Sequence, residues 1–170
     1  KRVLVIGPSG AGKSTLAMKL AQKTGLPLVH LDTEYWNPGW IATPDDEWKS
    51  RVEQLVARDS WIIEGNFAGT FAQGMPRADT IFGDQTSVVV YLAGLAPLLV
   101  IPWIDTTDLA PDCPEEFDPG FYKWIWDFPN HSQKKMDDAL ATIGAHASQI
   151  IITSDAEART FLESIHPKTD

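Results

Sequence analysis

Short apolar runs alternate with amphipathic stretches along the first half of the chain. Arg2–Ile6, Leu26–Leu31 and Ser60–Glu64 are rich in apolar residues, many of them β-branched, which is typical of strands buried inside a sheet. Between them, Lys13–Lys23 and the stretch that follows Thr43 carry apolar residues at helical spacing. This alternation predicts a parallel sheet with helices on both faces, so we expect an α/β protein with a doubly wound, three-layer sheet of about five strands.

The boundaries of the first two helices are marked by residues with clear conformational preferences. Gly25 stands where a left-handed residue commonly ends a helix. Thr43, followed by Pro44 and two aspartates, predicts a helix start, with Thr43 as the cap and Pro44 as the first helical residue. We expect this second helix to end near Ala57.

The second half of the chain continues the same alternation less clearly. A fourth strand is expected somewhere within Thr80–Leu92, followed by a helix over Ser132–Ile143 and a last strand over Gln149–Thr153. Ser154–Glu157 has the pattern of a capping box and predicts the start of a last helix that runs to about Ile165.

Composition limits the classes of function that the chain can serve. A length of 170 residues with 44% hydrophobic and 22% charged residues fits one globular domain. The single cysteine, Cys113, cannot form an internal disulfide, and we expect a cytoplasmic protein. A net charge of −9 argues against nucleic acid as a partner, because phosphate backbones are bound by basic surfaces.

One apolar stretch, Val88–Ile104, is a candidate membrane segment. It is shorter than the roughly 20 residues of a typical spanning helix, and Gly94, Pro97 and Pro102 interrupt it. The stretch also lacks basic flanks. We therefore expect a buried strand followed by a packed segment, and no membrane partner.

A glycine-rich motif links the first predicted strand to the first predicted helix. Gly7–Ser14 fits the pattern G-x-x-x-x-G-K-[ST] in full and lies between a strand and a helix, as the pattern requires. Its glycines allow the loop to curl so that successive N–H groups face one anion, and the helix start adds positive potential there. The candidate phosphate-binding residues are Gly7, Pro8, Ser9, Gly10, Ala11, Gly12, Lys13, Ser14 and Thr15.

The motif predicts a nucleoside triphosphate, ATP, bound with Mg²⁺. Lys13 is placed to reach the β- and γ-phosphates and is a candidate catalytic residue, while the Ser14 hydroxyl is a candidate Mg²⁺ ligand. Thr15 is placed to reach the α-phosphate. A small-molecule acceptor is the second expected partner.

Two carboxylates follow apolar runs and are expected at the carboxyl edge of the sheet, where doubly wound sheets bind ligands. Asp32 ends the second predicted strand and Glu64 ends the third, and both are candidate Mg²⁺ ligands. Asp32 is also a candidate catalytic residue, because it can accept a proton from an acceptor hydroxyl. The alternative for each is a capping or loop carboxylate.

Three further features allow two interpretations each. Arg77, a candidate catalytic residue, either contacts phosphate or forms a surface salt bridge. The aromatic residues Tyr35, Trp36 and Trp40, which follow Asp32, either line an acceptor pocket or belong to the core. His30 and His131 have no evident partner in the sequence and are taken as structural.

Nearly the whole chain resembles the bacterial adenylate-kinase-related P-loop proteins, which are often labelled topology modulation proteins. The shared motifs are the phosphate loop, Leu31-Asp32, Trp36-Asn37-Pro38-Gly39-Trp40, Trp61–Phe67, Arg77-Ala78-Asp79-Thr80, Pro111-Asp112-Cys113-Pro114 and Trp124–Pro129. The resemblance implies a sheet ordered 2-3-1-4-5, the P-loop NTPase fold of the nucleoside monophosphate and shikimate kinase type, and an ATP-dependent kinase or ATPase. Relatives usually have Asp where this chain has Glu64.

We expect a single domain over residues 1–170. Within it, the chain departs from this family in one segment. Relatives carry an arginine-rich lid where residues 81–107 are apolar here, and no Lys or Arg occurs between Arg77 and Lys123. One hypothesis is a compensated frameshift: legal codons for Thr86–Gly94, read one nucleotide later, spell Pro-Arg-Trp-Leu-Cys-Ile-Trp-Arg, and the agreement continues to Thr107. Two functions stay open, namely a Mg-ATP-dependent phosphotransferase and a nucleotide-binding protein with little or no kinase activity.

Overall fold

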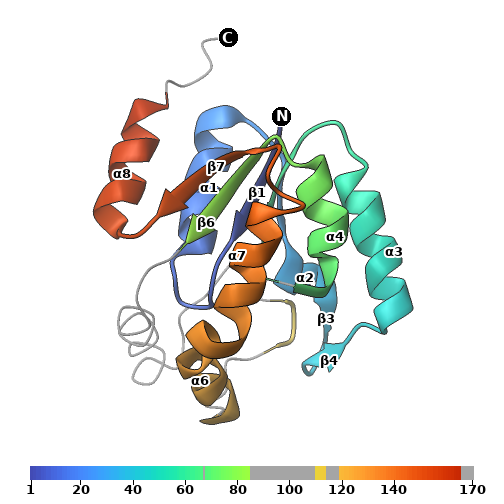
Figure 1. Cartoon of the computed structure of the whole chain (residues 1–170). Coiled ribbons are helices and arrows are strands. Elements are labelled where there is room, and N and C mark those ends of the chain that lie inside the picture. Colours follow the sequence, from blue (N-terminus) through green and yellow to red (C-terminus); the bar gives the residue numbers. More distant parts are fainter. Residues whose placement is uncertain (67, 85–109, 114–118, 166–170) are drawn as a thin grey trace.

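The computed structural model describes residues 1–66, 68–84, 110–113 and 119–165. Its centre is a five-stranded sheet in the order β2-β5-β1-β6-β7, and every pair of neighbouring strands is parallel (Figure 1). The strands are β1 (Arg2–Ile6), β2 (Leu28–His30), β5 (Trp61–Glu64), β6 (Thr80–Asp84) and β7 (Ser148–Ile152). Numbered along the chain, these strands follow the order 2-3-1-4-5, which confirms the predicted topology.

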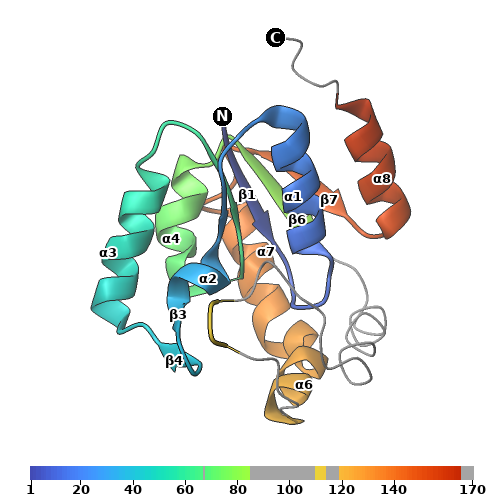
Figure 2. The ribbon, with the colours of Figure 1, turned by 180° about the vertical axis from the view of Figure 1, so that it is seen from behind.

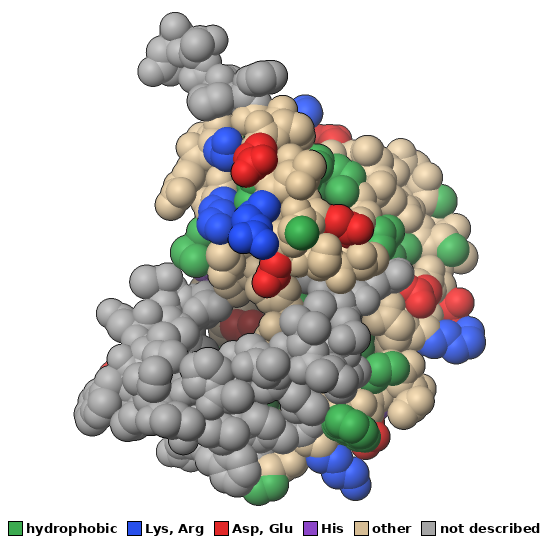
Figure 3. Space-filling view, turned by 90° about the vertical axis from the view of Figure 1, so that its left-hand side faces the viewer, with side chains coloured by type: hydrophobic (Ala, Val, Ile, Leu, Met, Phe, Trp, Pro, Cys, Tyr) green, Lys and Arg blue, Asp and Glu red, His purple; other side chains and the backbone are tan. Residues whose placement is uncertain are grey.

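Helices cover both faces of the sheet, as predicted. The helices α1 (Lys13–Thr24) and α8 (Asp155–Ser164) lie on one face (Figure 2), and α3 (Asp45–Val56), α4 (Phe71–Gly74) and α7 (Lys134–Ala141) contribute to the core on the other. On the face of the molecule that is on the left in Figure 1, Lys and Arg side chains are interspersed with Asp and Glu over the described part (Figure 3).

Alternate residues of β1 point into two separate hydrophobic cores. Val3 and Val5 pack with α1 and α8, whereas Leu4 and Ile6 pack with the helices on the opposite face. All four side chains are buried, with Ile6 at 0% exposure. Burial of a side chain of this size contributes about 1.5–3 kcal/mol, so β1 is anchored from both sides and the loop that follows it starts from a fixed point.

The predicted signals at helix ends are partly confirmed. Gly25 ends α1 in the left-handed conformation with φ of 69°, and Ser154 caps α8 by accepting a hydrogen bond from the Glu157 N–H. The prediction that Thr43 caps the second helix was wrong, because its hydroxyl donates to the Tyr35 carbonyl and Pro44 occupies the cap position of α3.

The segment after β2 differs from its prediction. The second strand ends at His30, and Leu31 begins a short helix, α2 (Leu31–Tyr35), so Asp32 lies in a helical turn and does not end a strand. A two-stranded antiparallel hairpin of β3 (Trp36–Asn37) and β4 (Ile41–Ala42) follows before α3.

Several shorter elements lie between the strands of the sheet. The 3₁₀ turns η1 (Ala68–Thr70) and η2 (Met75–Arg77) flank α4, and α6 (Pro119–Trp126) precedes a π-helical turn, η4 (Pro129–Gln133). The π-helical turn leads directly into α7, so the predicted helix over Ser132–Ile143 begins in π geometry. The strand that was predicted within Thr80–Leu92 is β6.

The membrane candidate Val88–Ile104 lies outside the described residues, and the predicted lid segment 81–107 lies outside them from residue 85 onward. Among the helices that the structure describes, none has the length and apolarity needed to cross a membrane.

Candidate active site at the carboxyl edge of the sheet

The phosphate loop connects the carboxyl end of β1 to the first turn of α1. Gly12 precedes α1 with φ of 81°, a left-handed conformation that disfavours any residue with a Cβ atom. The Ala11 N–H approaches the Pro8 carbonyl at 3.4 Å, and the Leu16 N–H bonds the Gly12 carbonyl at 3.0 Å, which closes the loop onto the helix. The N-terminal amides of α1 therefore face the loop, a geometry that favours anions.

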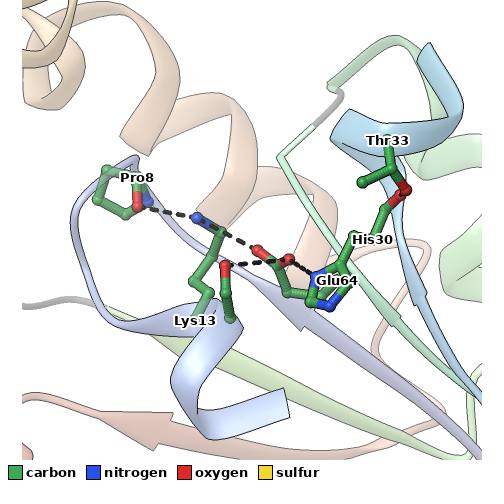
Figure 4. Close-up of polar contacts among 6 residues, drawn as sticks. Pro8, Lys13, His30, Thr33 and Glu64 are labelled. Atoms are coloured by element: carbon green, nitrogen blue, oxygen red, sulfur yellow. Dashed lines mark hydrogen bonds and ion pairs between the residues drawn. The ribbon is translucent and has the colours of Figure 1, made fainter. Parts of the chain in front are cut away.

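Lys13 is buried within the loop that it belongs to. Its side chain is 9% exposed, and its Nζ atom donates to the Pro8 carbonyl at 3.1 Å. The same ammonium lies 3.5 Å from Oε1 of Glu64 (Figure 4). Lys13 thus joins the loop to the neighbouring strand by one hydrogen bond and one ion pair.

Glu64 is the last residue of β5 and lies beside β1, where it is in register with Val5. The residue is 2% exposed, and its Oε2 atom accepts from the Ser14 hydroxyl at 3.3 Å. Burial raises the pKa of Glu64, but the hydrogen bond from His30 and the charge of Lys13 outweigh it, so the pKa lies below its ordinary value of 4.5. Glu64 is therefore an ionised carboxylate at neutral pH.

His30 completes this cluster from β2, although no partner for it was evident in the sequence. It ends β2 in register with Glu64, and its Nδ1 atom lies 2.9 Å from Oε2 of Glu64. The Thr33 hydroxyl donates to the His30 carbonyl at 2.7 Å (Figure 4). The available signal was positional, because His30 and Glu64 each end an apolar run that the topology places side by side.

Gly65 allows the ends of β2 and β5 to lie close together. Its φ is 147°, and a Cβ atom built on it would lie 2.7 Å from the Cβ atom of Leu31. Real Cβ atoms do not approach so closely, so glycine is required where the backbone leaves Glu64.

Asp32 is placed at the same edge of the sheet, in α2, two residues beyond His30. Its side chain is half-buried. Strands β2 and β1 lie on either side of β5 and run parallel to it. Asp32 follows the end of β2 and the phosphate loop follows the end of β1, so both lie at the carboxyl edge of the sheet. The structure thus brings both predicted carboxylates to one edge, with Glu64 in direct contact with the loop.

The structure does not bring Arg77 to this edge. Arg77 precedes β6, whose first residue Thr80 is in register with Val3 near the start of β1. Its neighbour Asp79 pairs with Arg2 at 3.2 Å, which marks the amino edge of the sheet. The prediction that Arg77 contacts phosphate is therefore corrected: the parallel strands place it at the edge opposite the phosphate loop.

The aromatic residues after Asp32 divide between core and hairpin. Tyr35 packs edge-on against Trp48 of α3 at a centroid distance of 5.0 Å and joins the core cluster. Trp36 and Trp40 contact each other edge-on at 5.6 Å and are half-buried on the β3–β4 hairpin.

A Mg²⁺ ion bound with nucleotide fits the oxygen donors of this site. No group of three or more His, Cys, Asp or Glu residues suited to hold a metal occurs in the described part of the chain. Mg²⁺ in nucleotide sites commonly takes one or two protein oxygens together with phosphate oxygens and water. The Ser14 hydroxyl and the Glu64 carboxylate provide such a pair of oxygens at the loop.

Comparison with solved structures shows the fold. The chain is similar to a shikimate kinase from Acinetobacter baumannii in complex with shikimate, with a TM-score of 0.54, 17% identity and coverage of 96% of this chain and 89% of that one. An unliganded sugar kinase from Janibacter sp. has a TM-score of 0.52, 18% identity and coverage of 96% and 90%. Shikimate kinase from Aquifex aeolicus has a TM-score of 0.52, 13% identity and coverage of 97% and 94%.

The chain therefore has the P-loop fold of shikimate-type kinases. No protein-family model and no curated protein matches the sequence.

Proposed function

We propose that this protein is a Mg-ATP-dependent phosphotransferase that acts on a small-molecule acceptor, with a nucleotide as one candidate acceptor. The observation that carries the proposal is the contact of Lys13 and Ser14 with Glu64 at the start of α1. A phosphate loop, a buried cation, a hydroxyl and an ionised carboxylate meet there, which are the groups that phosphoryl transfer requires.

Each residue of the site has a specific role in this proposal. The backbone of Gly7–Thr15 binds the phosphates, Lys13 neutralises the transferred phosphoryl group, and Ser14 and Glu64 hold Mg²⁺. When bound, Mg²⁺ neutralises charge on the phosphate oxygens. Asp32, at the same edge, either accepts the proton of the acceptor hydroxyl or contributes to the metal site.

Lys13 must change partners when a triphosphate binds. Its ammonium donates to the Pro8 carbonyl and pairs with Glu64. A phosphate oxygen is a stronger partner than a neutral carbonyl because the hydrogen bond gains charge assistance. Exchange of the Pro8 contact for a phosphate oxygen therefore favours binding.

The second candidate function is nucleotide binding with little or no kinase activity. It is favoured by the absence of Lys and Arg between Arg77 and Lys123 and by the position of Arg77 at the opposite edge of the sheet. Cations that stabilise the transition state are worth about 10³–10⁵ in rate in phosphoryl transfer. A chain without them keeps its phosphate loop and loses most turnover.

The proposal extends to the whole chain. We propose one domain over residues 1–170, kinship with the adenylate-kinase-related family whose motifs the sequence shares, and a place in the cytoplasm with no nucleic-acid or membrane partner. The shared motifs and the single cysteine support this extension.

A turnover assay separates the two functions. The wild type is incubated with ATP, Mg²⁺ and a panel of acceptors that includes nucleoside monophosphates, sugars and hydroxy acids, and formation of ADP and phosphorylated product is measured. Lys13→Ala is expected to abolish both, whereas Lys19→Ala, a change at an exposed position of the same helix, leaves them unchanged. Tight ATP binding without product from any acceptor favours the second function, and no ATP binding at all refutes both.

A further inference from the structure

The buried carboxylate Glu64 has partners of two different kinds. Lys13 and Ser14 belong to the phosphate loop and, under the proposed function, turn toward a bound nucleotide and Mg²⁺. His30 comes from β2, outside the loop, and its Nδ1 atom lies 2.9 Å from Oε2 of Glu64. Of these three partners, His30 is the one that does not have to rearrange when ligand binds.

The other contacts of Glu64 assign the donor of this hydrogen bond, because its Oε1 atom faces the Lys13 ammonium and its Oε2 atom accepts from the Ser14 hydroxyl, as a carboxylate does. A carboxylate only accepts hydrogen bonds, so Nδ1 of His30 must be the protonated nitrogen. The His30 side chain is 14% exposed and that of Glu64 is 2% exposed, so the bond lies away from solvent. A hydrogen bond to a charged group in such surroundings is stronger than one between neutral groups.

The backbone fixes the histidine as firmly as the carboxylate. His30 and Glu64 are paired in register on adjacent parallel strands, so their Cα positions are set by the sheet. The Thr33 hydroxyl bonds the His30 carbonyl at 2.7 Å and ties the end of β2 to α2. The imidazole is therefore presented to Glu64 by rigid elements, which is the requirement for a residue that positions another.

We infer that His30 is a positioning residue, whose Nδ1–H holds the Glu64 carboxylate against the phosphate loop so that Mg²⁺ and nucleotide bind cooperatively. This inference rests on the proposed function. Without the bond from His30, the carboxylate is free to rotate as soon as Lys13 and Ser14 turn to the ligand, and a buried charge is left with fewer partners. Residues that orient a metal-binding group commonly change metal affinity by about 10–100-fold when they are replaced.

The test is a thermodynamic cycle for binding. Dissociation constants for ATP are measured by titration calorimetry with saturating Mg²⁺ and with excess EDTA, and their ratio gives the coupling between metal and nucleotide. His30→Phe removes the donor and retains a ring, and we expect the coupling to fall by about 10-fold or more while the affinity in EDTA is unchanged. His30→Asn, which places an amide N–H near the position of Nδ1, is expected to restore most of the coupling.

The control is His146→Phe, because His146 bonds the Ala78 carbonyl, outside the phosphate loop and next to the Asp79–Arg2 pair at the amino edge. We expect wild-type coupling in this variant. If His30→Phe keeps wild-type coupling, or loses affinity equally with and without Mg²⁺, the inference is wrong while the proposed function stands. A wild type that binds no ATP refutes the proposed function and this inference together, and does so before any variant is compared.

A second measurement needs no variant. The ¹⁵N spectrum of the wild-type protein is recorded with ATP and Mg²⁺ at a pH at which imidazole rings are neutral. We expect the His30 ring to be the tautomer that carries its hydrogen on Nδ1. A ring protonated at Nε2 alone would overturn the inference, because such a ring has no hydrogen to give to Glu64.

Discussion

Ser14 and Glu64 are separated by 50 positions in the sequence, yet the Ser14 hydroxyl donates to the Glu64 carboxylate at 3.3 Å. The parallel pairing of β1 with β5 creates this contact, since both strands end at the same edge and α1 starts there. The contact joins the phosphate loop to a buried anion. The site therefore depends on the sheet as much as on the loop.

Replacement of Glu64 by Gln should remove a pH-dependent contribution to stability. The pKa of Glu64 is lowered in the folded protein, so its ionised form stabilises the fold above its ordinary pKa of 4.5. This contribution is lost as the pH falls through the still lower pKa of the folded state. We expect the wild type to unfold at a higher temperature than Glu64→Gln at neutral pH, with the difference shrinking below about pH 4.5.

Thermal denaturation of both proteins over a pH series checks this prediction. Asp79 and Glu157 also have lowered pKa values, because of backbone hydrogen bonds from Arg2 and Thr153, but they are unchanged in both proteins and cancel in the difference. A difference in unfolding temperature that does not vary with pH would show that Glu64 acts by packing alone.

The residue pattern predicted the parallel sheet and the loop, and the family resemblance implied the strand order, but neither predicted what surrounds Glu64. Gly7–Ser14 has a fixed spacing that specifies one geometry, so its place between β1 and α1 followed directly. His30 was missed because its partner lies 34 positions away and becomes a neighbour only through the pairing of β2 with β5. The two interpretations of Arg77 could not be separated, because a cation in the sequence does not reveal at which edge of a sheet it lies.

Gly65→Ala is expected to destabilise the fold by about 1–3 kcal/mol. The new Cβ atom would lie 2.7 Å from the Cβ atom of Leu31, and φ of 147° disfavours any residue other than glycine. Chemical denaturation measures the free energy of unfolding. Gly69→Ala is the matched control, since no atom lies within 4 Å of the position of its Cβ. Equal stability of the two variants would contradict the close approach of β5 to Leu31.

Ser154→Ala should cost about 1 kcal/mol through loss of a helix cap. The Ser154 side chain accepts from the Glu157 N–H at 3.3 Å, and no such acceptor exists in alanine. Leu162 of α8 packs in the same hydrophobic core as Val3 and Val5 of β1. Weakening the first turn of α8 therefore also weakens the packing of this helix against the sheet. The control is Ser164→Ala at the other end of α8, where the change is expected to stay within about 0.5 kcal/mol. Denaturant midpoints of the two variants provide the comparison.

Restoration of the arginine-rich segment is expected to raise turnover. The string read from the shifted frame, Pro-Arg-Trp-Leu-Cys-Ile-Trp-Arg and its continuation, is introduced in place of Thr86–Thr107, and phosphoryl transfer is compared with that of the original chain. If cations in this segment stabilise the transition state, the rate increases by up to about 10³–10⁵ while ATP affinity changes little, because the loop at Gly7–Ser14 is unchanged. The same string with each Arg replaced by Gln is the control and should give no increase. An increase with the Gln string would assign the effect to shape, and no increase with either would leave the chain as a nucleotide-binding protein whose loop and Glu64 serve binding alone.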